Sequence, residues 1–370
     1  MPRTAERRHK HERVAELLDR HGLEGVLLSR RCNFAWYTCG ARNYVGTACD
    51  VGNSTLLVTR RDGTCVLTTS IEQTRLRDED LKGTDIEVFG WSYADAADRR
   101  KVLGEAIGHR QVAADVPLPD VDAEPLPEDF DRLRWTLTDG EIERYRALAG
   151  DVTDAVETVA RTVEPGQTEY EVAGEASREL VRRGCLPWVL LVGADKRLEA
   201  HRHPLPTGKP VRTYVMVATC AEREGLIAAC SRLAAFEKIW GELAQRHRGV
   251  VTVDAALIRS TQPGVTLGDI FAEAQKAYAT AGFPDQWQFH HQGGSIGYLP
   301  REVKAAPGCK VEALDRQAFA WNPTIAGTKC EDTILCRESG PELLAPPTDW
   351  PMLRAKWKGF EIDRPAILER

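Results

Sequence analysis

A short segment that ends one helix and begins another occurs twice in this chain. The first copy spans residues 164–168 (EPGQT) and the second spans 262–266 (QPGVT), about a hundred residues later by their numbering. In each copy Pro-Gly stops a helix, and an amphipathic helix pattern follows at 170–183 or at 267–281. The repeat predicts that one domain consists of two similar halves related by pseudo-twofold symmetry.

The residues before the first copy predict a second, smaller domain. Thr138 and Glu141 form a capping box that starts a long helix reaching Val163. Upstream, helical and strand-like patterns alternate, which is typical of a small α/β domain. The helical patterns are at 12–23, 71–76 and 99–107, and the strand patterns are at 26–28, 54–58, 64–68, 86–89 and 111–114. A Pro- and acid-rich stretch, 117–131, predicts a linker, so we expect domains at 1–130 and 131–370.

The composition argues against several classes of protein. A formal charge of −6 over 370 residues lacks the basic character of a general nucleic-acid binder. No apolar run approaches the roughly 18 to 20 residues that a membrane span needs. The ten cysteines are scattered without a CxxC pair, and no signal-peptide pattern precedes them. We therefore expect reduced thiols, a cytoplasmic location, and neither nucleic acid nor membrane as a partner.

Several segments are similar to motifs of one enzyme family. They are 164–169 (EPGQTE, like k-P-G-x-T-E), 215–221 and 225–232 (like two metal-bearing strands), 290–297 (HHQGGSIG, like H-x-x-G-H-G-x-G), 321–323 (WNP, like x-E-P) and 331–333 (EDT). Over nearly its whole length the chain resembles the creatinase/aminopeptidase P/prolidase family, the pita-bread metallopeptidases. The resemblance implies an α/β N-terminal domain and an α+β pita-bread catalytic domain with a pseudo-twofold repeat.

The same resemblance implies five positions that hold two metal ions. In this chain they are Ala218, Ala229, Gly294, Asn322 and Glu331, of which only Glu331 is a good ligand for a hard metal. Two divalent ions need several anionic ligands, both for affinity and to offset their mutual repulsion. We therefore expect a divergent member of the family that lacks most metal ligands, binds no metal there and uses no other cofactor. It should not be a functional metalloaminopeptidase.

A rebuilt metal site is a second possibility. Strand alternation places Cys220 and Ser231 on the face where the metal positions lie. Cys220 together with His290, His291 or His201 offers ligands for zinc, although their spacing matches no recognised motif. Alternatively, Cys220 is a small buried side chain that fills space.

Acid–base chemistry depends on a histidine and on Glu331. Residues 199–204 (EAHRHP) resemble the place where the family positions a non-ligand histidine at the substrate. We predict His201 as the general acid/base, with His203 as its rival because Pro204 follows it directly. A buried Glu331 without metal should have a raised pKa, so that it carries protons or anchors a cationic substrate.

The remaining pocket residues are predicted from the same motifs. The predicted substrate-binding residues are His203, His290, His291, Asn322, Ser231, Cys220, Tyr37 and Arg42. Residues 33–40 (NFAWYTCG) resemble the segment with which one subunit reaches its partner's active site, which implies a homodimer. Arg42 is suited to clamp a substrate carboxylate with two hydrogen bonds.

Two classes of function follow. Creatinase shows that the family includes a metal-free hydrolase, but one of its glutamates corresponds to Ser231 here, which disfavours creatine as the substrate. We expect a creatinase-like, metal-independent enzyme that hydrolyses a C–N bond in a small amide, amidine or amino-acid derivative, with His201 and Glu331 as acid–base residues. Such an enzyme suits a biosynthetic or catabolic step. The alternative is a catalytically dead pita-bread protein that serves as a binding or scaffold protein.

Overall fold

The computed structural model describes residues 3–61 and 63–370, which form two compact units. The first unit extends to Arg134 and includes Thr138–Glu141. The second comprises Trp135–Leu137 and Ile142–Arg370. Among the described residues, no helix has both the length and the apolar character needed to cross a membrane.

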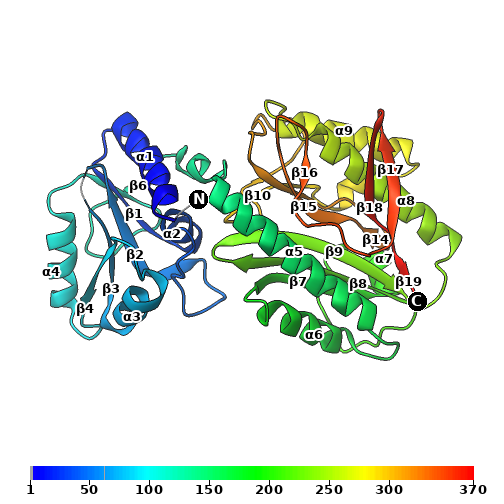
Figure 1. The fold of residues 1–370 in the computed structure, drawn as a ribbon, viewed down its shortest axis with the longest axis horizontal. Coiled ribbons are helices and arrows are strands. Elements are labelled where there is room, and N and C mark those ends of the chain that lie inside the picture. The colour runs from blue at the N-terminus through cyan, green and yellow to red at the C-terminus, as the bar shows by residue number, and fades with distance from the viewer. Residues whose placement is uncertain (1–2, 62) are drawn as a thin grey trace. The chain divides into compact units, whose positions relative to one another are not determined.

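The first unit is built on a six-stranded mixed sheet, drawn in blue and cyan in Figure 1. Its strands are β1 (Gly25–Arg30), β2 (Val51–Thr59), β3 (Thr64–Thr69), β4 (Glu87–Trp91), β5 (Val112–Ala114) and β6 (Glu124–Pro125), in the order β4-β3-β2-β1-β5-β6. Its helices are α1 (Arg3–His21), α2 (Arg31–Thr38), α3 (Ser70–Arg75) and α4 (Ala96–Ile107), with single turns η1 (Leu76–Asp80) and η2 (Phe130–Arg134). Strand β6 lies inside the stretch expected to be a linker, so that stretch contributes to this sheet.

A buried lysine joins three parts of the first unit. The ammonium of Lys10 lies 2.8 Å from carboxylate oxygens of both Glu6 and Glu141, and it donates a hydrogen bond of 2.6 Å to the carbonyl of Trp36. The expected capping box is confirmed, because the Thr138 N–H donates to Glu141 and the Glu141 N–H donates back to Thr138. Burying this charge is tolerable only because two carboxylates and a carbonyl replace its water.

The second unit contains a nine-stranded sheet flanked by helices, drawn from green to red in Figure 1. Its helices are α5 (Asp139–Thr162), which begins in the first unit, α6 (Glu169–Val181), α7 (Lys196–Ala200), α8 (Gly241–Ser260), α9 (Leu267–Thr280) and the turn η3 (Gln286–Phe289). The main strands run in the order β11-β10-β12-β15-β9-β8-β7, while β16 pairs with β15 and β19 pairs with β9.

The strands of the second unit have the following bounds. They are β7 (Leu186–Ala194), β8 (Tyr214–Arg223), β9 (Leu226–Ala235), β10 (Gly293–Ile296), β11 (Val303–Lys304), β12 (Ala318–Trp321), β13 (Thr324–Ile325), β14 (Thr328–Lys329), β15 (Glu331–Leu335), β16 (Glu342–Leu343), β17 (Met352–Trp357), β18 (Phe360–Pro365) and β19 (Leu368–Glu369). Strands β13 and β14 form a small hairpin, and β17 and β18 form another. Helices α8 and α9 pack side by side over an apolar core that includes residues of β12, β15 and β17.

The two copies of the repeated segment adopt the same local structure, which confirms the predicted repeat. Gly166 and Gly264 both have positive φ, of 97° and 82°, and their N–H groups donate to Val211 and Ala313 respectively. The threonine two residues after each glycine then caps the next helix, by accepting the N–H of the third helical residue. The same residue types at the same spacing therefore perform the same tasks in both halves.

A buried histidine ties α8 to the C-terminal strands. The His247 ring donates from Nε2 to the carbonyl of Pro365 at 2.9 Å, so its Nδ1 accepts the hydroxyl of Thr328 at 2.6 Å. A neutral imidazole satisfies both of these hydrogen bonds. Burial lowers the pKa of His247 to about 4, although the hydrogen bond to Pro365 acts in the opposite direction.

The protonation of His247 should make the protein less stable in mild acid. Its pKa is lower in the folded chain than in the unfolded one, so its contribution is complete above about pH 6.5 and is lost as the pH falls toward 4. We expect a loss of about 3 kcal/mol in the free energy of unfolding over this range. Urea unfolding of the native chain and of His247→Gln isolates this term, because the other titrating groups are common to both. If the native chain and His247→Gln showed the same pH dependence of stability, His247 would not be the group responsible for the loss.

Candidate functional site

A cavity of about 450 Å³ lies against the large sheet of the second unit. Its lining residues are Val189, Leu191, His203, Leu205, Ala218, Thr219, Cys220, His291, Pro300, Arg301, Lys304, Asn322, Lys329 and Glu331. Ser231 of β9 lies opposite both Ala218 of β8 and Glu331 of β15. Directly opposed residues project on the same face of a sheet, so these three positions share the face that carries the cavity.

Glu331 is the only carboxylate among these lining residues, and two cations hold it. Its Oε2 lies 2.6 Å from the ammonium of Lys329, and its Oε1 accepts a hydrogen bond of 3.0 Å from Arg301. All three side chains are largely buried. Burial raises the pKa of Glu331, but the positive charges of Lys329 and Arg301 outweigh it and leave the pKa below its usual range. The predicted rise in pKa is therefore wrong, because the sequence argument included burial but omitted these two cations.

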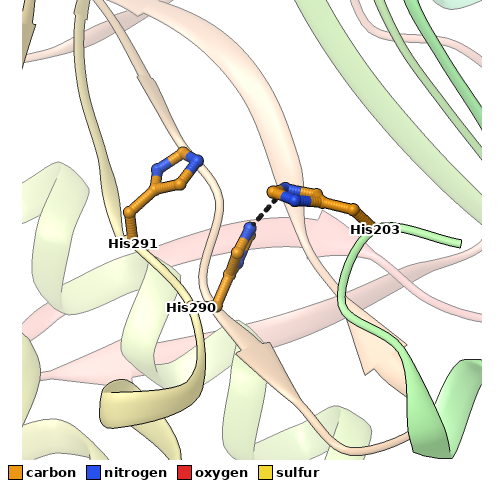
Figure 2. A group of neighbouring side chains, drawn as sticks. All are labelled: His203, His290 and His291. Atoms are coloured by element: carbon orange, nitrogen blue, oxygen red, sulfur yellow. Dashed lines mark hydrogen bonds between the residues drawn. The ribbon is translucent and has the colours of Figure 1, made fainter.

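Three histidines converge at one side of the cavity. His203 comes from the loop after α7, whereas His290 and His291 precede β10. Figure 2 shows the His203 and His290 rings pointing toward each other, with 2.9 Å between their Nε2 atoms. The Gly293 N–H donates to Nδ1 of His291 at 3.3 Å.

These histidines are held in their neutral form. Burial lowers the pKa of His203, and the charge of Lys329 lowers it further. The pKa of His291 falls to about 4 through burial and the charge of Arg301. Burial and the same Lys329 charge place the pKa of His290 far below its usual range. A neutral imidazole can accept a proton, so His203 at the open edge of the cavity is suited to act as a base.

The structure places His203 in the cavity wall and His201 outside it, and the acid–base role of His201 stays a prediction. His201 closes α7 with its N–H bonded to the carbonyl of Arg197, and its exposed side chain is not among the residues that line the cavity. The chain then bends, and Pro204 packs onto the backbone of Gly193, where a side chain at 193 would leave no room. This anchored turn directs His203 into the cavity.

The remaining predicted pocket residues of the second unit lie at or near the cavity. Cys220 and Asn322 line it and are buried. Ser231 is also buried and shares their sheet face, although it is not part of the cavity wall. Within the described chain, the Asn322 Oδ1 and Ser231 Oγ atoms have no hydrogen-bond partner. Unpaired buried polar atoms beside a cavity are available to a ligand or to water.

The two predicted residues of the first unit have different surroundings. Tyr37 is 1% exposed, and its hydroxyl lies 2.9 Å from both His11 and Thr64. It is a core residue of the first unit, and its contribution to a partner's pocket stays a prediction. Arg42 is half exposed and donates from Nε to Asp80 at 2.8 Å. Its role in a dimer stays a prediction.

Sequence reasoning missed the three cationic residues of the cavity, Arg301, Lys304 and Lys329. Lys329 stands two residues before Glu331, a spacing that places two side chains on one face of an extended segment. The pairing of Lys329 with Glu331 could therefore have been predicted from the sequence. Arg301 follows the strand β10 by way of a loop, and no periodicity in the sequence indicates that this loop folds back onto Glu331.

The residues present do not fit a pair of divalent metal ions. Ala218 and Ala229 have no ligand atom, and Asn322 offers only a neutral amide. Both oxygens of Glu331 already contact cations. Gly294 has a φ of 152°, and a β-carbon there would collide with the carbonyl of Val303. A histidine at 294 therefore has no space in this backbone, and the cavity's cations would repel added metal charge.

Comparison with known proteins agrees with this fold. The chain is 21% identical over 222 residues to a putative dipeptidase, YkvY, from Bacillus subtilis, and the match covers 58% of this chain and 61% of that relative. The prolidase from Pyrococcus horikoshii superposes with a TM-score of 0.76 at 16% identity, covering 92% of this chain and 98% of that one. The N-terminal domain of the FACT complex subunit SPT16 from Cicer arietinum gives a TM-score of 0.67 at 12% identity, covering 91% and 96%.

These structural matches confirm the two-domain pita-bread fold that the motifs predicted. The family model for metallopeptidase family M24 matches residues 143–338, more than half of the chain. The matched curated relative is described as a putative dipeptidase, and dipeptidases hydrolyse amide bonds. The chain therefore belongs to metallopeptidase family M24.

Proposed function

We propose that this protein is a hydrolase that cleaves a C–N bond in a small, nitrogen-containing acid without the two-metal centre of its family. The observation that carries the proposal is the pairing of Glu331 with Lys329 and Arg301 beside the neutral imidazole of His203. Fixed cations in a cavity can stabilise the negative charge that develops when water attacks a carbonyl or amidine carbon. They would take over the electrostatic task that metal ions perform in a two-metal hydrolase.

The charge of the cavity supports an acidic substrate. Three cationic side chains, Arg301, Lys304 and Lys329, stand against the single carboxylate of Glu331, which gives the lining a formal charge of +2 with neutral histidines. Such a site attracts an anion. The same positive charge disfavours a cationic substrate anchored by Glu331. A volume of about 450 Å³ suits a metabolite or a dipeptide.

Each residue has a role in the proposed reaction. His203 removes a proton from the attacking water and returns it to the leaving nitrogen. Arg301 and Lys329 stabilise the oxyanion, and the unpaired Oδ1 of Asn322 accepts a hydrogen bond from an N–H of the substrate. Lys304, which is exposed at the cavity, binds the substrate's acidic group.

Removal of His203 should abolish most of the activity. A panel of dipeptides, N-acetyl amino acids and amidino acids, incubated with chelator-treated protein and followed by mass spectrometry, should reveal the substrate. His203→Ala should then lower kcat/KM by about 10² to 10⁴, the usual contribution of general acid–base catalysis. His201→Ala is the matched control and should retain activity, because that side chain lies outside the cavity.

Three results of this experiment would contradict the proposal. One is activity that appears only after two metal ions per chain are restored, as expected of a metallopeptidase. Another is loss of activity in His201→Ala but not in His203→Ala. The third is the absence of any turnover together with binding to a macromolecule, as expected of the catalytically dead scaffold.

Lys304 should set the preference for an acidic substrate. It lines the cavity but is exposed, so Lys304→Met changes the charge without removing a buried ion pair. Binding of N-acetyl amino acids and of their primary amides, compared by calorimetry, should show that the native chain prefers the acids. The variant should reduce this preference by about tenfold, which corresponds to the energy of one charge-assisted contact. Lys310→Met, also exposed but outside the cavity, should leave it unchanged.

The stability of the cavity should depend on matched charges. Lys329→Met leaves the buried Glu331 with only one cation, and we expect the free energy of unfolding to fall by about 3 kcal/mol. Adding Glu331→Gln removes the unbalanced charge and should restore a large part of that loss. Denaturant unfolding of the two single variants and the double variant measures the coupling. If the effects of the two substitutions on the free energy of unfolding simply added, Lys329 and Glu331 would not stabilise each other.

A further inference from the structure

The three histidines at the cavity have a geometry that also suits a single metal ion. One nitrogen from each of His203, His290 and His291 lies within 4.8 Å of the other two. Figure 2 shows that the three rings converge on one region, from the loop after α7 and from the segment before β10. The strand ligands implied by the family resemblance are not part of this group.

The distance between the two closest nitrogens is informative. Two nitrogen atoms bound to one tetrahedral zinc ion are roughly 3.3 Å apart, since each bond is about 2.0 to 2.1 Å long. The Nε2 atoms of His203 and His290 are 2.9 Å apart, so a small rotation of either ring suffices. Two ring nitrogens that face each other can share either one proton or one metal ion.

The third ligand requires an exchange of tautomer. The Gly293 N–H donates to Nδ1 of His291, which places the ring proton on Nε2 in this arrangement. That hydrogen bond is long, at 3.3 Å, and is therefore weak. Binding a metal through Nε2 requires this proton to move to Nδ1, which breaks the weak hydrogen bond from Gly293.

The chemistry of the ligands determines which ions bind. Imidazole nitrogens favour Zn²⁺, Cu²⁺ and Ni²⁺ over the harder ions Mg²⁺ and Ca²⁺, which prefer oxygen. Three histidines also leave a fourth coordination position open, on the side of the cavity. The nearby charges of Arg301, Lys304 and Lys329 oppose a bare dication, so the open position should be filled by an anion.

We propose that His203, His290 and His291 form a site for one zinc-class ion, which takes an anion from the cavity as its fourth ligand. An ion held there occupies the lone pair of His203, so that His203 can no longer accept a proton. Zinc would therefore inhibit the hydrolysis reversibly. Only this last step depends on the proposed function.

Zinc binding to the chelator-treated full chain tests the site directly. Calorimetry with ZnCl₂ should give one ion per chain, and Co²⁺ should produce the visible absorption of a four-coordinate site. His203→Ala should weaken zinc binding by more than about tenfold, the scale on which even the outer partners of a metal act. His201→Ala is the matched control and should bind zinc as the native chain does. Acetate, used as the anion, should strengthen zinc binding, and Mg²⁺ should not compete.

Unchanged zinc affinity in His203→Ala, or equal loss in His201→Ala, would overturn the site. His290→Ala offers a second check, and circular dichroism verifies that this variant with an altered buried residue is folded. If acetate has no effect on zinc affinity, the anionic fourth ligand is wrong.

The inhibitory step has its own readout. With a substrate from the panel, activity should fall with the same zinc midpoint that calorimetry gives. Full activity, or increased activity, of the zinc-loaded chain would overturn the inhibition. Absence of turnover in the zinc-free chain would instead reject the proposed hydrolase and leave the binding result standing.

Discussion

The charge on Glu331 is the constraint around which the second unit's cavity is arranged. A carboxylate buried this deeply is stable only with compensating charge, and Lys329 and Arg301 supply it from two different segments. Their charges keep Glu331 ionised and also lower the pKa values of the nearby histidines. Burial and the cations that pair with Glu331 therefore favour neutral imidazoles at the edge of the cavity, and the same cations leave the cavity lining positive.

The same strand carries a second buried acid on its opposite face. Asp332 follows Glu331 directly, and its two oxygens contact Arg232 at 2.9 Å and Arg364 at 2.8 Å. Since side chains alternate along a strand, the two neighbouring acids serve separate tasks. Asp332 holds β9 and β18 together inside the core, whereas Glu331 faces the cavity. This division explains how the cavity face can change its chemistry while the core network of the fold stays intact.

This chain and the matched prolidase share a fold. Family membership and the pita-bread fold follow from the matches, whereas the pocket has its own charge pattern. The FACT subunit domain has a similar fold, and its name indicates membership of a complex, so the fold alone does not specify catalysis. Function has to be argued from the cavity, where Lys329, Arg301 and His203 are the residues that matter most.

The sequence by itself determined the elements and their repetition, because those depend on local signals. Pro-Gly stops, threonine caps and apolar spacing act within a few residues, and both copies of the repeat formed as expected. It also placed Ala218, Cys220 and Glu331 together, through motifs and strand alternation. Only the tertiary structure decided that His203 and not His201 enters the cavity, that Tyr37 is buried, and that Arg301 meets Glu331. Those outcomes depend on how loops pack and on charges distant in sequence, and a side chain's pKa follows from all the groups that surround it in space.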